Sequence, residues 1–160
     1  MFKVGDLAVY PAQGVGVIEG VVSKTVMGLE QRFYVIKILS NKAKIMVPKN
    51  GTSSVGLRCV ISKDEVPAIY SILKEKNVSI EKQTWNKRYK EYWEKIKTGS
   101  VYEIAKVLRD LVTLKCDKDL SFGERKMMDT AMSLLITEIS IAQCCEETKV
   151  EKEISTIFAA

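Results

Sequence analysis

The stretch Ile61-Ser62-Lys63-Asp64-Glu65-Val66-Pro67 marks the change in periodicity on which the predicted fold depends. Before it, apolar residues recur at about every second position, as in β-strands, and after it they recur at about every 3.6 positions, as in α-helices. Ser62 and Glu65 have the spacing of a capping box, in which a hydroxyl and a glutamate accept hydrogen bonds from the free N–H groups of a helix start. The stretch therefore predicts the end of a β-rich part and the start of a helical part, which is an α+β fold.

The part before Ser62 contains short runs rich in β-branched residues, each bounded by turn-forming residues. In Arg32-Phe33-Tyr34-Val35-Ile36-Lys37-Ile38, inward and outward positions nearly alternate, as in an antiparallel strand with one buried face. Four or five such strands predict a small curved antiparallel sheet or barrel, a module that binds a protein, peptide or nucleic acid through a groove or a free edge. The predicted strands are 7–10, 15–23, 32–39 and 44–47.

The part after Ser62 contains three further Ser/Thr-x-x-Glu pairs, each at the spacing of a helix start. Apolar stripes at helical spacing follow these pairs, so we expect a compact α-helical bundle. We therefore place the β domain at 1–61 and the helical domain at 62–160, with the boundary between residues 61 and 80. The pairs are Ser100/Glu103, Ser121/Glu124 and Thr148/Glu151, and the predicted helices are 62–76, a basic helix from Trp85 to before Gly99, 100–115, 121–145 and 148–158.

The basic helix opens with Thr84-Trp85-Asn86-Lys87-Arg88-Tyr89-Lys90, which places an indole beside three cations. Residues 82–97 carry six Lys or Arg against two Glu. Such cations bind phosphates, and an aromatic ring at a helix end can wedge against an unstacked base pair. The residues themselves therefore make nucleic acid the leading partner.

Two other interpretations of this helix stay open. The charges also fit a solvated helix face, because Lys87–Glu91 and Lys90–Glu94 are i,i+4 pairs. The aromatic rings also fit a face packed in the core, although a ring in the first turn can project past the helix end. The apolar stripe consists of Trp85, Tyr89, Tyr92, Trp93 and Ile96.

The composition argues against several classes of protein. The chain has 160 residues, 46% hydrophobic and 28% charged, with a net charge of +5, as in an ordinary globular protein. It has no histidine and no phosphate-binding glycine loop, so we expect no enzyme activity and no metal site. Because no apolar run is long enough to cross a bilayer, we expect a cytoplasmic protein.

Four cysteines without C-x-x-C spacing are expected to be buried structural thiols: Cys59, Cys116, Cys144 and Cys145.

Two sets of motifs resemble the CarD/CdnL family of bacterial transcription regulators, and together they cover essentially the whole chain. The first is similar to the CarD-type RNA polymerase-interacting domain and comprises Phe2-Lys3-Val4-Gly5-Asp6-Leu7-Ala8-Val9-Tyr10-Pro11, Gly14-Val15-Gly16 and Val47-Pro48. The second resembles the helical DNA-binding domain of the family and comprises Trp85-Asn86-Lys87-Arg88-Tyr89-Lys90, Glu94-Lys95-Ile96, Gly99, Val107-Leu108-Arg109-Asp110-Leu111 and Leu120-Ser121-Phe122-Gly123-Glu124-Arg125-Lys126-Met127.

The resemblance implies a Tudor-like barrel that docks on the β subunit of RNA polymerase, partly by strand pairing. The polymerase-binding positions implied in this sequence are Lys24, Val26 and Met46. Met46 stands where related chains carry a basic residue, so the charge of the docking surface differs here.

The resemblance also implies that the helical domain contacts promoter DNA at the upstream edge of the melted −10 region. Trp85 would wedge into the minor groove and hinder closure of the bubble, while Lys87, Arg88, Lys90, Arg125 and Lys126 would hold phosphates without reading sequence. The family acts without a cofactor or effector, and we expect a monomer. The alternative function is a protein-only adaptor whose barrel binds another partner and whose helical bundle is a scaffold.

Overall fold

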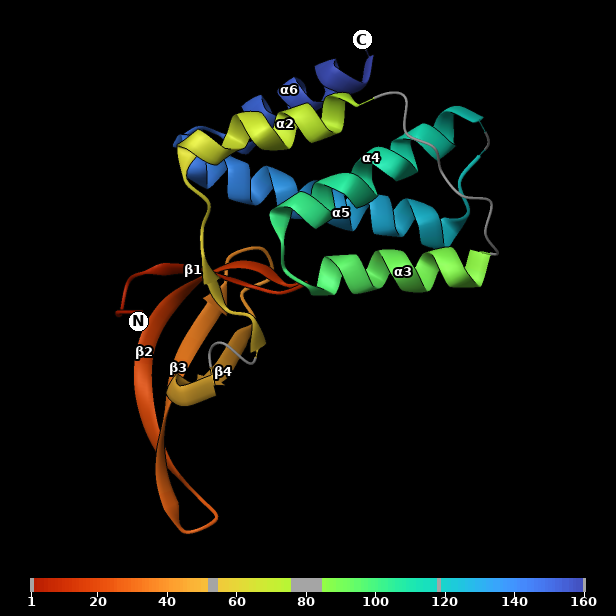
Figure 1. Cartoon of the computed structure of the whole chain (residues 1–160). Coiled ribbons are helices and arrows are strands. Elements are labelled where there is room, and N and C mark those ends of the chain that lie inside the picture. Colours follow the sequence, from red (N-terminus) through yellow and green to blue (C-terminus); the bar gives the residue numbers. More distant parts are fainter. Residues whose placement is uncertain (1, 52–54, 76–84, 118, 160) are drawn as a thin grey trace. The chain divides into compact units, whose positions relative to one another are not determined.

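The computed structural model describes residues 2–51, 55–75, 85–117 and 119–159. Contacts divide the chain into two compact units, Met1–Val60 and Ile61–Ala160 (Figure 1). The first unit is built from strands and the second from helices, which confirms the α+β class with two parts.

The first unit is an antiparallel sheet of five strands in the order β4-β3-β2-β1-β5. The prediction of a closed barrel is wrong, because β4 and β5 are opposite ends of this sheet in the described residues. Closure requires the end strands to pair, and β5 has only two residues, which pair with Ala8 and Val9 of β1. The strands are β1 (Leu7–Tyr10), β2 (Gly14–Val26), β3 (Leu29–Ile38), β4 (Lys44–Pro48) and β5 (Arg58–Cys59), and the 3-10 turn η1 (Lys49–Gly51) follows β4.

β2 and β3 form a long hairpin that extends beyond the rest of the sheet (Figure 1). At its tip, Met27 and Gly28 have φ of 52° and 80°, and two successive positive φ angles are typical of a type I′ hairpin turn. Between Val21 and Arg32 the side chains of the hairpin are exposed on both faces. The strands are longer than predicted because periodicity reports one-sided burial, which this part of the hairpin does not have.

One face of the sheet, the inner face, is buried. Gly16 lies where the chain leaves no space for a side chain: a Cβ there would be 2.5 Å from Cγ2 of Ile36 and 3.0 Å from the carbonyl oxygen of Lys37. The phenol ring of Tyr34 is also buried and meets Phe2 edge to face, with the ring centres 6.1 Å apart. The core of the inner face consists of Ala8, Ile18, Tyr34, Ile36, Ile38, Val47 and Leu57.

In its described residues, the second unit contains a 3-10 turn and five helices. Within it, α2 and α6 pack together on one side of α4 and α5, and α3 packs against α4 and α5 on the other side (Figure 1). Their facing stripes form a continuous apolar core, as predicted for a bundle. The elements are η2 (Lys63–Glu65), α2 (Val66–Lys74), α3 (Trp85–Lys97), α4 (Val101–Asp117), α5 (Phe122–Gln143) and α6 (Glu147–Ala159).

Capping residues explain several of these helix starts. Ser121 and Glu124 form the predicted box at α5, where each backbone N–H donates to the other residue's side chain at 3.2 Å. The backbone N–H of Ser62 donates to the Glu65 carboxylate at 2.9 Å, at the 3-10 turn that leads into α2. The prediction that Thr148 caps the last helix is wrong, because α6 begins at Glu147.

The cysteines differ from the prediction of buried thiols. All four are free, three are exposed, and Cys145 is half-buried. Two of the exposed cysteines lie at helix ends. Cys116 is in the last turn of α4. Cys144 follows α5 in the left-handed conformation with φ of 53°. The exposed residues are Cys59, Cys116 and Cys144.

Candidate nucleic-acid and polymerase interfaces

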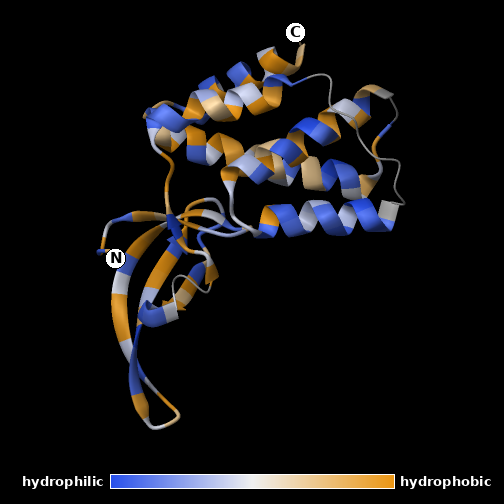
Figure 2. Ribbon diagram, in the orientation of Figure 1, coloured by the Kyte–Doolittle hydropathy of each residue, from blue (hydrophilic) through white to orange (hydrophobic). Residues whose placement is uncertain are grey.

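Trp85 is the first residue of α3, as predicted from the sequence. Its side chain lies outside the described residues, so the predicted exposure of the indole stays a prediction. The rest of the helix is mostly hydrophilic along its length (Figure 2).

α3 buries a different stripe from the one expected. Arg88, Tyr92 and Ile96 are buried at i, i+4 and i+8, so Tyr92 and Ile96 are confirmed as core residues. Tyr89 is 38% exposed and Trp93 is half-buried, with their rings edge to face and 6.0 Å between ring centres. The core-facing stripe is therefore rotated toward Arg88 and away from Tyr89.

Arg88 forms a buried ion pair with Glu124. Its Nη1 lies 3.8 Å from Oε2 of Glu124, and the two side chains are 11% and 3% exposed. Because Glu124 is also the capping-box residue of α5, the pair joins the first turn of α3 to the first turn of α5. The prediction that Arg88 holds a phosphate directly needs revision, since its guanidinium is shielded from solvent.

Tyr92 packs within the same buried surroundings. Burial raises the pKa of Tyr92 to about 12, and the Asp110 carboxylate adds to the rise while Arg88 opposes it. The phenol is therefore neutral at ordinary pH, and the guanidinium of Arg88 is the cation beside it.

Arg109 and Asp110, which belong to the α4 motif that resembles the CarD/CdnL family, form ion pairs within the helical unit. Nε of Arg109 lies 3.1 Å from Oδ1 of Asp110, and its Nη1 lies 2.6 Å from Oε2 of Glu75. Both motif residues are buried, so they hold the end of α2 against α4 and do not offer a binding surface.

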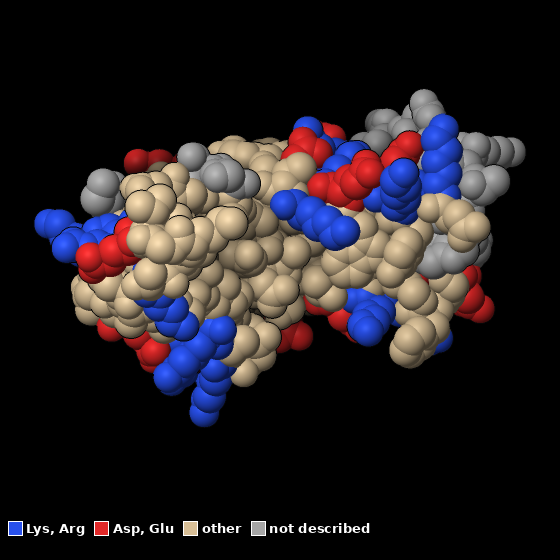
Figure 3. Space-filling model, turned by 90° about the horizontal axis from the view of Figure 1, so that it is seen from below, with Lys and Arg blue, Asp and Glu red and all other residues tan. Residues whose placement is uncertain are grey.

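Four other cations of α3 and α5 are exposed at the surface. Lys87 and Lys90 are exposed in the first two turns of α3, and Arg125 and Lys126 are exposed in the first two turns of α5. We name these four cations and Phe122 the α3/α5 surface. Figure 3 shows that Lys and Arg side chains on this view are interspersed with Asp and Glu. Positive charge is therefore confined to small groups of side chains and does not cover the whole face.

Phe122 is part of this surface and was not found from the sequence. It is the first residue of α5 and is 75% exposed, although phenylalanine is usually buried. A sequence signal did exist: Phe122 lies outside the apolar stripe formed by Met127, Ala131 and Leu135.

The first unit offers a second exposed surface. Directly paired residues of antiparallel strands share a face of the sheet, and the register pairs Lys24 with Gln31, Val26 with Leu29 and Met46 with Val35. These residues alternate with the buried Tyr34 and Ile36, so they form the opposite face, which we name the outer face. Lys24, Val26 and Met46 are all exposed on it, and so are Val22 and Leu29.

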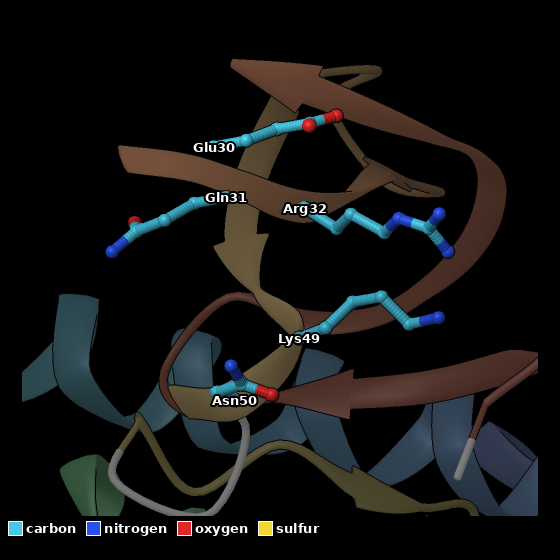
Figure 4. Close-up of a pocket in the computed structure, with 5 residues that line it drawn as sticks. All are labelled: Glu30, Gln31, Arg32, Lys49 and Asn50. Carbon is cyan, nitrogen blue, oxygen red and sulfur yellow. The ribbon is translucent and has the colours of Figure 1, made fainter. Parts of the chain in front are cut away.

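A hollow of about 410 Å³ lies beside the hairpin, where β3 meets η1. Arg32 belongs to the inner-face register, and Nζ of Lys49 lies 5.5 Å from the ring centre of Tyr34. The side chains of Arg32 and Lys49 extend in the same direction, whereas Gln31 points the other way (Figure 4). The outer face of the hairpin is therefore mainly apolar, with Lys24 among its apolar residues, whereas the hollow is lined by polar and charged side chains that include the acidic Glu30.

Comparison with known proteins agrees with this division into two units. Residues 2–61 match the CarD-like/TRCF RID domain, and residues 68–155 match the CarD C-terminal domain. The "Putative transcription factor YdeB" of Bacillus subtilis (strain 168) is 34% identical over 151 residues, which are 94% of this chain and 98% of that protein. The chain belongs to the CarD family. The solved structure "CdnLNt from Myxoccoccus xanthus" is 53% identical and covers 39% of this chain and 87% of its own, with a TM-score of 0.34.

Membership in the CarD family gives the coarse function. The RID domain is an RNA polymerase-interacting domain, so RNA polymerase is a partner of this CarD-family chain. An RID domain followed by the CarD C-terminal domain indicates a transcription regulator, and the family is not enzymatic, as predicted.

Neither a metal site nor a membrane span is found among the described residues of this CarD-family chain. Within the described ranges, no three Cys, Asp or Glu side chains are grouped so that they could hold a metal ion. Across the same residues, every helix is too short or too polar to cross a bilayer.

Proposed function

We propose that this CarD-family chain binds the β subunit of RNA polymerase through its sheet and stabilises the open promoter complex through α3 and α5. The observation that carries the proposal is the buried Arg88–Glu124 pair, which holds two exposed basic first turns together. One of those turns begins with Trp85 and the other with the exposed Phe122.

The outer face supports the polymerase half of this proposal. Exposed apolar residues at the centre of a contact, with polar and charged residues at its rim, are typical of protein interfaces. Val26 and Met46 are each 39% exposed, and Lys24 lies between Val22 and Val26 on the same face. β4 is an end strand of the sheet in the described residues, so it can add a strand from the β subunit by main-chain pairing.

The α3/α5 surface supports the DNA half. Lys87, Lys90, Arg125 and Lys126 would hold phosphates, which position the protein without reading sequence. Trp85 would wedge into the minor groove at the upstream edge of the −10 bubble. Unstacking a base step costs on the order of a few kcal/mol, and it costs least where the duplex is already opening.

The wedge acts through a difference in affinity. A ligand shifts an equilibrium only if it binds one state better than the other. A preference of about 1.4 kcal/mol for melted DNA raises a small open fraction about tenfold. In this mechanism Arg88 is a positioning residue, because it fixes α3 against α5. Lys87 and Lys90 contact the phosphates of the DNA backbone.

The substitution Trp85→Ala tests the mechanism. We expect about a tenfold shorter lifetime of open complexes after a competitor challenge, with unchanged recovery of RNA polymerase in a pull-down. Trp93→Phe is the matched control, since it alters the other tryptophan of α3, and it should leave the lifetime unchanged.

An unchanged lifetime for Trp85→Ala would refute the wedge. If the reversal Lys87→Glu/Lys90→Glu also left promoter output unchanged, the chain would act as the protein-only adaptor instead. Circular dichroism of each variant checks that the helices remain folded.

A further inference from the structure

In the helical unit, a hollow with a volume of about 440 Å³ lies between α2 and α6. Tyr70 and Ile157 are half-buried in its walls, and their apolar surfaces are open to solvent at the groove. Three exposed lysines stand around it: Lys74 from α2, and Lys149 and Lys152 from α6. The groove therefore combines an apolar floor with a cationic rim.

The single acidic side chain in the groove is already engaged. The hydroxyl of Tyr70 donates to Oε2 of Glu153 at 2.6 Å. Burial and this carboxylate raise the pKa of Tyr70, so the phenol stays protonated and keeps donating. The three lysines consequently dominate the charge that an incoming partner meets.

Charge is divided between the two sides of α6. Glu147 and Glu151 line a separate hollow with Asp129 of α5, whereas Lys149 and Lys152 line the groove with α2. Among the residues that line the groove, Glu153 is the acidic neighbour that α6 supplies to these lysines, and its carboxylate accepts from Tyr70. The groove also lies across α4 and α5 from α3 (Figure 1), so it is not part of the α3/α5 surface.

We propose that the α2/α6 groove binds an acidic amphipathic helix of a partner protein. Such a helix lays its apolar side chains into a groove between two helices, with anchors at every third or fourth position. The walls of Tyr70 and Ile157 take one or two of these anchors, and Lys74, Lys149 and Lys152 meet the flanking carboxylates. A nucleic-acid backbone uses the cations but leaves the apolar floor unfilled, so the peptide is the better complement.

The test uses the full chain and a fluorescein-labelled helical peptide with leucine at every third or fourth position and glutamate elsewhere. Fluorescence anisotropy should detect binding, and Lys149→Glu/Lys152→Glu should weaken it by about tenfold, because two attractions become repulsions. Lys74→Glu, on the facing helix, should weaken it in the same direction. The matched control Lys3→Glu/Lys42→Glu changes the same charge on exposed lysines of the first unit and should have little effect.

Two competitors separate the possible occupants. A scrambled peptide of the same composition lacks the leucine stripe and should bind at least about tenfold more weakly. Equal binding of both peptides, or equal loss in the groove and control variants, would overturn the proposal in favour of unspecific attraction. If unlabelled duplex DNA displaced the peptide and its own binding were lost in Lys149→Glu/Lys152→Glu, the occupant would be a phosphate backbone and the proposal would be wrong.

Discussion

Arg88 carries a buried positive charge that Glu124 balances across two helices. At 3.8 Å, the contact between Nη1 and Oε2 is longer than a hydrogen bond, so it is mainly an electrostatic attraction. Such an attraction is strong where water is excluded, and losing one partner leaves the other charge buried and unbalanced. The pair therefore fixes how α3 lies on α5, and removing either partner should destabilise the helical unit.

Glu124→Gln should destabilise the helical unit by about 3 kcal/mol, because it leaves the Arg88 guanidinium without its counter-charge. Glutamine can still complete the capping box with Ser121, so the helix start is retained. Urea denaturation followed by circular dichroism measures the free energy of unfolding. In the background Arg88→Met, the same Glu124→Gln change should cost less than about 1 kcal/mol. An equal cost in both backgrounds would show that the two charges are not coupled.

Lys87 and Arg88 should differ in how they affect DNA binding. Each cation that contacts a phosphate releases a counterion, so Lys87→Ala should reduce the magnitude of the log–log slope of DNA affinity against salt by about one. Arg88→Lys keeps the buried charge and should leave that slope unchanged. Titration of a labelled duplex at several salt concentrations measures both slopes. A reduced slope for Arg88→Lys would restore Arg88 as a direct phosphate contact.

The sequence separates these two residues poorly. Lys87, Arg88 and Lys90 stand in one basic run, and helical spacing leaves the identity of the buried side open until the partners on α4 and α5 are known. Arg88 is buried because it lies one turn before Tyr92 and faces Glu124, a contact between residues far apart in the chain. Phe122 is a different case, because its place outside the apolar stripe of α5 is a local signal that could have been read from the sequence.

At the scale of elements, the β2–β3 hairpin presents two different surfaces. Lys24 and Ser23 are neighbours in β2, but the register pairs Lys24 with Gln31 and Ser23 with Arg32. Alternation along a strand therefore directs Lys24 to the outer face and Ser23 to the inner one. This geometry allows the proposed polymerase contact to be tested with two adjacent residues.

Lys24→Glu should weaken binding to RNA polymerase by about tenfold, because it reverses a charge within the proposed contact. Ser23→Glu is the matched control: it adds a negative charge one residue away, on the other face and beside Arg32, and should have little effect. Quantitative pull-down or calorimetry with polymerase measures both affinities. Equal losses for the two variants would place the contact at the hairpin as a whole and not on its outer face.

Local signals predicted the elements, and non-local ones decided how they assemble. The capping box of α5 and the alternation in β3 depend on residues within a few positions of each other, and both elements were found where expected. Whether the sheet is open or closed depends on its end strands, and one of them, β5, has two residues. A strand of two residues is too short for an alternating pattern to be recognised in the sequence. The hairpin tip beyond Val21 is exposed on both faces and also gave no alternation.

At the scale of the whole molecule, the chain joins two units with separate cores. A tethered second site binds at the effective concentration set by its linker, so two weak contacts act together. The polymerase then supplies the promoter, which removes the need for sequence-specific DNA contacts. In the proposed mechanism, the covalent connection is as important as either surface.

Cutting that connection should therefore abolish regulation while both contacts survive. We expect an equimolar mixture of residues 1–60 and 61–160 to need at least about a hundredfold higher concentration than the intact chain to lengthen open-complex lifetime. Pull-down of 1–60 with RNA polymerase, and circular dichroism of both pieces, serve as controls for folding and docking. Should the mixture match the intact chain at equal concentration, tethering would contribute nothing. The second unit would then reach open promoters unaided. Its own affinity for melted DNA would have to be far higher than the affinity that four exposed cations and an aromatic wedge can provide.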